Sequence, residues 1–274
     1  MMLGVLGRWP ILMDIMSDTH FELVKNGQML KSIELYWKRN TSFFNLRTKN
    51  GSNTDEVIDE HYRVLAACGD ICSIDQMTVY LDKVSALYDY VLFVPGNHEY
   101  YGQEMNSINT ALDDINKQYD NVHIFIPGNE RLLLRDDLMI HGTTLWADVY
   151  KGCRVNSKRT PISIGNRLLN YIDMNSLYDY AVEQLDNTIA ISADRSLDTI
   201  VLTHHAPTLS VRNIYYSNDH CGYVSDLTYL LADPLIAWVY GHTHSNITTT
   251  VNDVLITSSQ WGSPRNIVKN GLIV

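Results

Sequence analysis

The chain has 274 residues, enough to bury a substantial hydrophobic core, and its 45% hydrophobic and 19% charged residues describe an ordinary globular protein. Its formal net charge of −10 opposes non-specific binding to nucleic acid or to an anionic membrane surface. These numbers exclude a disordered, fibrous or strongly basic protein and favour a folded chain without linkers.

The first segment of the chain, residues 1–18, is apolar but interrupted by Arg8, Pro10 and Asp14. It lacks the basic and continuous apolar regions of a secretory signal, and no stretch approaches the roughly 20 apolar residues of a transmembrane helix. The four cysteines follow no zinc-ribbon or disulfide-framework spacing. We therefore expect a cytoplasmic protein in a reducing compartment, with no membrane partner.

The first expected strand covers residues 11–16 and ends in Ser17-Asp18-Thr19-His20. At an extended strand end, residues i and i+2 point to the same face, so Asp18 and His20 could bind one cation. Taken alone, the same residues also fit a helix N-cap and a surface histidine.

Two irregular segments, 21–60 and 150–167, interrupt the rhythm of strands and are rich in basic residues. The first contains a predicted helix at 28–40, whose apolar residues share one helical face. Such basic inserts are ordinary solvated surface, or they form a lid or groove wall for an anionic substrate.

Glycine and a polar residue end the next two expected strands. The strand 64–68 ends in Gly69-Asp70, a helix at 75–88 follows, and a strand from Val91 ends in Gly96-Asn97-His98-Glu99. Gly96 can adopt positive φ, which would let the three following side chains turn over the strand end. This is a βαβ unit, so the parallel strands end on one side, where α/β sheets bind ligands.

The second half of the chain repeats this pattern. Two more buried strands, 199–203 and 235–240, end in His204-His205 and in Gly241-His242-Thr243-His244. The remaining expected elements are helices at 104–119, 174–193 and 225–231, a strand at 122–126, and hairpins at 132–141 and 247–257.

Five buried strands thus end in carboxylate, amide or imidazole side chains, and six of the ten histidines lie in these five loops. Carboxylates and imidazoles are the side chains that bind divalent transition metals. Each loop has an ordinary explanation of its own, but five such coincidences in one chain are improbable.

In their order, the motifs D-x-H, GD, GNH[D/E], V-x-x-H and GHxH resemble those of the calcineurin-like metallophosphoesterase superfamily, and THHAP and GNHEYYG are similar to its compact bacterial and viral branch. The resemblance implies an α/β fold, a two-sheet β sandwich flanked by helices. It also implies one metallophosphoesterase domain over residues 1–274, with inserts at 21–60 and 150–167.

The resemblance further implies a dinuclear metal site. One metal would bind Asp18, His20 and His244, the other would bind Asn97, His204 and His242, and Asp70 would bridge both. His98 would contact the phosphate and protonate the leaving group, whereas His205 would support the site without binding metal. The mixed nitrogen and oxygen donors favour Mn, Fe, Zn or Co over calcium.

Two such cations hold a phosphate and activate a water near neutral pH, so a metal hydroxide replaces a Ser or Cys nucleophile. The leading hypothesis is therefore hydrolysis of a small phosphodiester or phosphomonoester, for example a nucleotide, with His98 as general acid. The arginine of the protein phosphatase motif GDxVDRG is absent after Asp70, which speaks against a protein substrate. The alternatives are a nuclease that uses the basic inserts as a groove and a non-catalytic scaffold of the same fold.

Overall fold

A computed structural model describes residues 11–39, 44–45, 62–151, 153, 161–211 and 222–262. Residues 1–10 and much of both basic inserts (40–43, 46–61, 152 and 154–160) lie outside the described residues. The interpretation of the inserts as a lid or groove wall, and of the chain as one domain, therefore stays a prediction.

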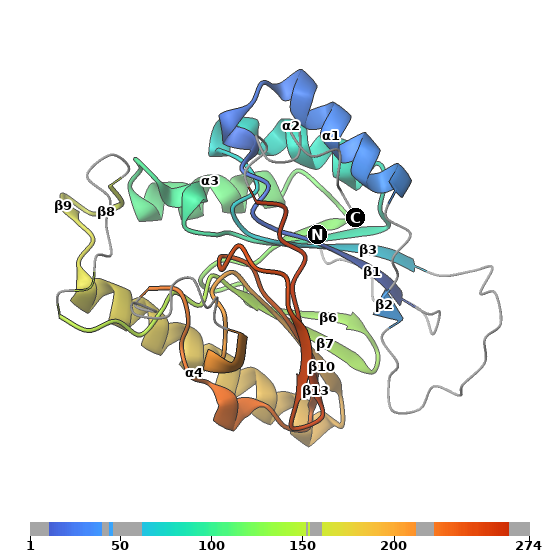
Figure 1. Cartoon of the computed structure of the whole chain (residues 1–274), viewed down its shortest axis with the longest axis vertical. Coiled ribbons are helices and arrows are strands. Elements are labelled where there is room, and N and C mark those ends of the chain that lie inside the picture. The colour runs from blue at the N-terminus through green and yellow to red at the C-terminus, as the bar shows by residue number, and fades with distance from the viewer. Residues whose placement is uncertain are drawn as a thin grey trace.

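The first sheet has five strands in the order β2-β1-β3-β4-β5. Four of them are parallel: β1 (Ile11–Met16), β3 (Tyr62–Cys68), β4 (Tyr90–Val94) and β5 (Val122–Ile124). The short strand β2 (Phe44–Asn45) pairs antiparallel with β1 at the edge. The helices α1 (Asn26–Arg39), α2 (Ile74–Ser85) and α3 (Met105–Asn116) cover the outer face of this sheet (Figure 1).

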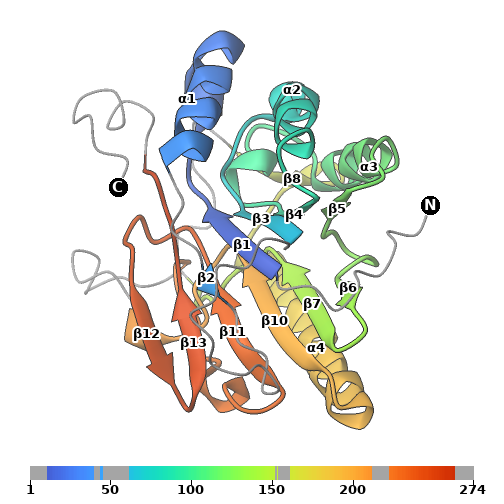
Figure 2. The ribbon, with the colours of Figure 1, turned by 90° about the vertical axis from the view of Figure 1, so that its right-hand side faces the viewer.

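The second sheet has six strands in the order β12-β13-β11-β10-β7-β6. Its strands are β6 (Arg131–Arg135), β7 (Leu138–Thr143), β10 (Asp198–Thr203), β11 (Leu235–Val239), β12 (Thr248–Val251) and β13 (Val254–Thr257). The four inner strands are parallel, and the outer strands β6 and β12 are antiparallel to their neighbours. The long helix α4 (Tyr171–Arg195) covers the outer face of this sheet (Figure 2).

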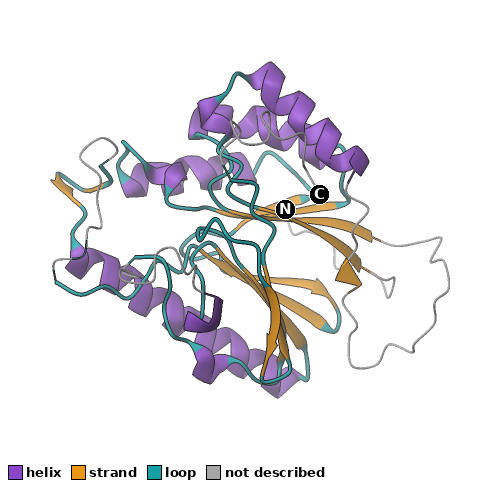
Figure 3. Ribbon diagram, viewed as in Figure 1, coloured by secondary structure: helices purple, strands orange, loops and turns teal. Residues whose placement is uncertain are grey.

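The two sheets pack face to face through a shared apolar core. Residues such as Ile15, Ala66 and Leu92 of the first sheet belong to one buried cluster with Ile140 and Leu202 of the second. Figure 3 shows the resulting four layers, helices, sheet, sheet and helix. The model therefore confirms the expected two-sheet sandwich flanked by helices.

The expected helix at 225–231 is wrong. Only a 3₁₀ turn, Thr228–Leu230, forms there. The backbone N–H of Ser225 donates to the carbonyl of Ala206, and that of Leu227 donates to the carbonyl of Pro207. Because these N–H groups pair with a distant segment, they are not available for a helix, and the apolar spacing reflects burial against β10 and α4 instead.

Two smaller features differ from the expectations, a short hairpin and a disulfide-bonded cysteine. The second insert contains a short hairpin, β8 (Ser163–Ile164) with β9 (Arg167–Leu168), which the sequence did not predict. Cys153 is disulfide-bonded, whereas Cys68 and Cys72 are free and buried. The spacing of the cysteines in the sequence did not predict this bond, because a disulfide depends on the distance between two residues in the fold.

Among the described residues, no helix is long and apolar enough to span a membrane.

Candidate metal centre

The loops that follow β1, β3, β4, β10 and β11 meet at one end of the sandwich. Backbone hydrogen bonds tie them together: the N–H of Asp18 donates to the carbonyl of Gly69, and the N–H of Gly241 donates to that of His204. All seven residues predicted to bind metal lie in these loops: Asp18, His20, Asp70, Asn97, His204, His242 and His244.

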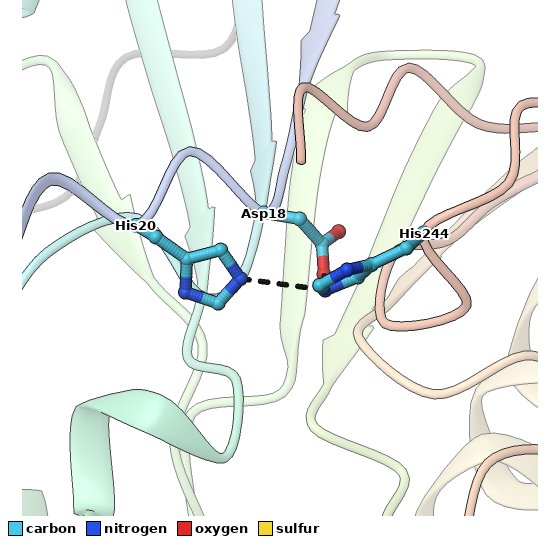
Figure 4. Close-up of side chains that lie close together, drawn as sticks. All are labelled: Asp18, His20 and His244. Atoms are coloured by element: carbon cyan, nitrogen blue, oxygen red, sulfur yellow. Dashed lines mark hydrogen bonds and ion pairs between the residues drawn. The ribbon is translucent and has the colours of Figure 1, made fainter. Parts of the chain in front are cut away.

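One group of donor atoms is formed by Asp18, His20 and His244, which come from both ends of the chain (Figure 4). The Nε2 atoms of His20 and His244 are 3.3 Å apart, and Nε2 of His244 is 3.3 Å from Oδ1 of Asp18. The backbone N–H of His242 donates to the same carboxylate at 3.0 Å, which fixes its orientation.

A second group is formed by Asp70, His204 and His242, with Asn97 beside them. Nε2 of His204 lies 2.9 Å from Oδ1 of Asn97, 3.1 Å from Nδ1 of His242 and 3.3 Å from Oδ1 of Asp70. Three potential ligand atoms thus surround a fourth within hydrogen-bonding distance.

The outer nitrogens of these rings have acceptors of their own. Nδ1 of His20 donates to Oε1 of Glu22 at 3.0 Å, and Nδ1 of His204 donates to the carbonyl of Cys68 at 2.9 Å. A proton on each outer nitrogen leaves the lone pair of the neutral ring on Nε2, which faces the centre.

His242 and Asn97 are oriented in the same way. Nε2 of His242 is 3.2 Å from the carbonyl of Gly222, and the amide nitrogen of Asn97 donates to the hydroxyl of Tyr101 at 2.7 Å. Lone pairs of nitrogen and oxygen therefore point toward one another, an arrangement that a divalent cation between them stabilises. The donor set fits a metal centre.

The backbone of the centre is held in sparsely populated conformations. Positive φ occurs at ten described residues other than glycine, and five of these are predicted ligands: Asp18, His20, Asp70, His242 and His244. Such conformations cost about 1–3 kcal/mol each and persist where surrounding contacts impose them, commonly at functional sites. The loops around β1, β3 and β11 are thus built to aim these side chains.

Gly96 is needed here for a reason other than the one expected from the sequence. Its φ is not among the positive values, so the expectation of positive φ was wrong. A Cβ atom at Gly96 would contact Oδ1 of Asp70, and one at Gly69 would contact Nδ1 of His204. The absence of a side chain lets the loops approach one another.

Asp70 and His204 are both fully buried and electrostatically linked. Burial alone would raise the pKa of Asp70, but the imidazoles of His204 and His98 hold it well below its usual range. Burial would lower the pKa of His204, but Asp70 raises it to about 9. The centre therefore keeps a negative carboxylate at its middle and attracts positive charge. Without a metal that charge is a proton on His204, which a bound cation would replace.

His98 lies at the rim of the centre. Its side chain is 32% exposed, its backbone N–H donates to Oδ1 of Asp70 at 2.8 Å, and its Nε2 lies 3.8 Å from Oδ2 of the same residue. His205 lies behind the centre: it is buried, and its Nδ1 donates to the carbonyl of Thr144 at 3.0 Å. Burial and neighbouring His204 lower the pKa of His205 to about 3.

Sequence reasoning gave no role to Glu22, Glu99 or Tyr101, which support the centre from outside. Glu99 accepts hydrogen bonds from the backbone N–H groups of Asp70 and Gly96, and so joins two of the loops. The spacing of Asp18, His20 and Glu22, at i, i+2 and i+4, is the one signal that could have indicated a shared site.

Several known proteins are similar to this chain in sequence or in fold. The family model described as calcineurin-like phosphoesterase matches residues 13–246. An uncharacterised protein of Acanthamoeba polyphaga mimivirus, L509, is 33% identical over 231 residues, which cover 72% of this chain and 78% of that protein.

Two solved structures are similar in fold. The phosphopantetheinyl hydrolase PptH of Mycobacterium tuberculosis has a TM-score of 0.58 and 16% identity, with 96% of this chain and 94% of that chain covered. A dimetal phosphatase of Danio rerio has a TM-score of 0.51 and 9% identity, with 91% and 87% covered.

Proposed function

The chain belongs to the calcineurin-like phosphoesterase family, whose members are metal-dependent phosphoester hydrolases, and on this basis we propose that it hydrolyses a small phosphodiester or phosphomonoester, such as a nucleotide. The observation that carries the proposal is the convergence of carboxylate, amide and imidazole donors from five strand ends on overlapping groups, which share His20 and the buried carboxylate of Asp70.

The proposed ligands fall into two sets. Asp18, His20 and His244 would hold one cation, and Asn97, His204 and His242 would hold the other. Asp70 groups with His20 and His98 on one side and with His204 and His242 on the other, which suits a bridging carboxylate. The mixture of nitrogen and oxygen donors favours Mn, Fe, Zn or Co. When bound, such a pair of cations supplies positive charge for a phosphate and activates water near neutral pH.

The protein's own residues would supply the rest of the chemistry. His98 is exposed at the rim and presents Nε2 toward Asp70, so it is placed to give a proton to the departing oxygen of a phosphoester bound there. The free cysteines cannot replace water as nucleophile, because burial raises the pKa of Cys68 and of Cys72.

The proposal is tested with purified protein, added Mn²⁺, and two substrates, p-nitrophenyl phosphate and bis-p-nitrophenyl phosphate. We expect hydrolysis of at least one substrate and loss of that activity after chelation. On ethyl phosphate, whose leaving group needs a proton, we expect a fall of at least about 100-fold in kcat for His98→Ala. Asp136→Asn, at an exposed turn, is the control that should keep full activity. Wild-type rates equal to those of Asp70→Asn on both substrates would overturn the proposal.

The two alternatives have less support. The net charge of −10 opposes a nuclease. A scaffold would not need donor atoms that face one another at 2.9–3.3 Å. A steep loss of DNA affinity with rising salt would support the nuclease, and the absence of a gel shift at low salt would remove it. Absence of metal from an elemental analysis of the purified protein would revive the scaffold.

A further inference from the structure

Glu22 is the one acidic side chain among the described residues that contacts two imidazoles of the centre through a single oxygen. Its Oε1 is 3.0 Å from Nδ1 of His20 and 3.0 Å from Nδ1 of His98. The two rings lie edge to face, with their centroids 4.4 Å apart. One carboxylate oxygen therefore joins a proposed metal ligand to the proposed general acid.

The fold fixes the position of Glu22. The residue lies in the 3₁₀ turn Phe21–Leu23, directly after the loop that carries Asp18 and His20. The side chain of Phe21 is completely buried, and its backbone N–H donates to the carbonyl of Ile71 at 2.8 Å. Because the turn is anchored at its first residue, the carboxylate of the second can reach both rings.

A carboxylate accepts hydrogen bonds but, when ionised, does not donate them, so each Nδ1 carries the proton of its contact with Glu22. The opposite nitrogen of each ring then faces the centre. Nε2 of His20 lies 3.3 Å from Nε2 of His244, and Nε2 of His98 lies 3.8 Å from Oδ2 of Asp70.

Among the described residues, the carboxylate of Glu22 makes no backbone hydrogen bond that would give it a purely structural role. Its second carboxylate oxygen, Oε2, is buried and has no hydrogen-bond partner within the described part of the chain. Glu99, by contrast, uses both oxygens to accept backbone N–H groups. The partners of Glu22 are the two rings, so its removal would release them without cutting a backbone contact.

We propose that Glu22 is a positioning residue that holds His20 and His98 with Nδ1 protonated and Nε2 directed at the metal centre. The inference rests on the proposed function, because it assigns the role of ligand to His20 and of proton donor to His98. His98 donates from Nε2 of the doubly protonated ring, while its Nδ1–H stays on Glu22. It assigns Glu22 no contact with the substrate.

Three variants separate geometry from charge. Glu22→Gln keeps a carbonyl oxygen that can accept both hydrogen bonds, and it places the amide nitrogen where Oε2 has no partner. Glu22→Ala removes the acceptor. Glu22→Asp keeps the charge but shortens the side chain by one methylene, so it cannot reach both rings. The last variant serves if Glu22→Ala fails to fold.

The first readout is independent of activity. Long-range ¹H–¹⁵N correlation spectra of metal-free protein with labelled histidines, assigned with His20→Gln and His98→Gln, report which ring nitrogen carries the proton. We expect a proton on Nδ1 of both rings in wild type and Glu22→Gln, joined at His98 by a second proton on Nε2 when the ring is charged. In at least one ring of Glu22→Ala and Glu22→Asp we expect the neutral form to be a mixture of tautomers. Two results would overturn the inference. One is that Glu22→Ala and Glu22→Asp both show the same ring protonation as wild type, and the other is that Glu22→Gln loses the proton on Nδ1.

The second readout compares leaving groups at saturating metal. p-Nitrophenyl phosphate releases its leaving group as the p-nitrophenolate anion, which needs no proton. Ethyl phosphate must release ethanol, so its leaving oxygen has to receive a proton. We expect Glu22→Ala to lower kcat on ethyl phosphate by about 10–100-fold, the usual effect of residues that orient such groups, and by much less on p-nitrophenyl phosphate. An equal loss on both substrates would count against positioning of His98. If the wild-type protein is inactive but gives the expected spectra, the proposed function is wrong and the positioning of the two rings by Glu22 still holds.

Discussion

At the scale of single residues, Glu99 shows how a buried carboxylate serves structure. It is 2% exposed, its Oε1 accepts from the N–H groups of Ile71 and Cys72, and its Oε2 accepts from those of Asp70 and Gly96. Burial and the charge of Asp70 raise the pKa of Glu99 to about 7, against the lowering effect of His204 and the backbone donors. Glu99 therefore fixes the loop of Asp70 against the loop of Asn97.

Glu99→Gln tests this role. In this variant the amide nitrogen of the glutamine replaces one carboxylate oxygen and faces backbone N–H groups, which are donors too. We therefore expect the free energy of unfolding to fall by about 3 kcal/mol, the cost of losing hydrogen bonds to a charged group. We also expect at least tenfold weaker metal binding. Urea denaturation of metal-free protein and metal titration measure the two effects.

Glu34→Gln is the matched control for this variant. Glu34 pairs with Lys83 at 2.7 Å on the surface, and such exposed pairs contribute roughly 0–1 kcal/mol. A change in unfolding free energy for Glu99→Gln no greater than that of the control would show that the loops hold each other without the carboxylate.

At the scale of elements, His141 links strand β7 to helix α4. It is completely buried, and its Nδ1 is 2.8 Å from the hydroxyl of Thr188, which donates to the carbonyl of Gln184. The ring nitrogen Nε2 has no partner within the described residues. Burial, and to a lesser extent Arg131, lower the pKa of His141 to about 3.

This depressed pKa predicts loss of stability in acid. Between pH 6.5, the usual histidine pKa, and pH 3, the unfolded chain binds a proton at this residue and the folded chain does not, so stability falls as pH falls. At pH 5 the loss relative to pH 8 is about 2 kcal/mol for this residue.

His141→Gln removes the titration and keeps a polar side chain next to Thr188. Urea denaturation of metal-free wild type and variant at pH 8 and pH 5 isolates the effect as a difference of differences. The variant should lose about 2 kcal/mol less than wild type on acidification. Parallel losses in the two proteins would show that His141 is protonated in the folded state.

Most elements could be predicted because their residues decide them locally. The strand 11–16 and the helix at 28–40 follow from apolar runs and helical spacing, and the structure places them at Ile11–Met16 and Asn26–Arg39. The failures have long-range causes. Residues 225–231 have the apolar spacing of a helix, but their backbone pairs with the segment 206–207. Strand β2 is two residues long, which is too short for a periodic pattern.

The site follows the same division. Asp18, Asp70 and His242 could be predicted as neighbours because they sit at strand ends in a recognisable order. The spacing of Glu22 from His20 could have indicated that it lies near the site, but its contact with His98 could not be predicted, nor could the contact of Tyr101 with Asn97, because both contacts exist only after folding. The sequence motifs indicated which side chains would lie at the centre, and the fold shows which other residues orient them.

At the scale of the whole molecule, the centre joins the two sheets. Asp18, His20, Asp70 and Asn97 follow strands of the first sheet, whereas His204, His242 and His244 follow strands of the second. A cation held by both sets would bind the folded chain and not the unfolded one, in which these residues are far apart. Metal binding should therefore raise the stability of the entire sandwich.

Thermal unfolding with and without metal tests this coupling. Free Mn²⁺ or Zn²⁺ at 100 times its Kd adds about 2.7 kcal/mol per site, which corresponds to a rise in Tm of about 5–10 °C for a chain of this size. Chelation should reverse the rise. Asp18→Ala and His242→Ala remove a proposed ligand from one sheet each, and both should reduce the shift, whereas Asp136→Asn at an exposed turn should leave it intact. A shift that survives in His242→Ala but not in Asp18→Ala would place the metal in the set of Asp18, His20 and His244 alone. An unchanged Tm in every protein would mean that the folded chain binds no metal at this centre.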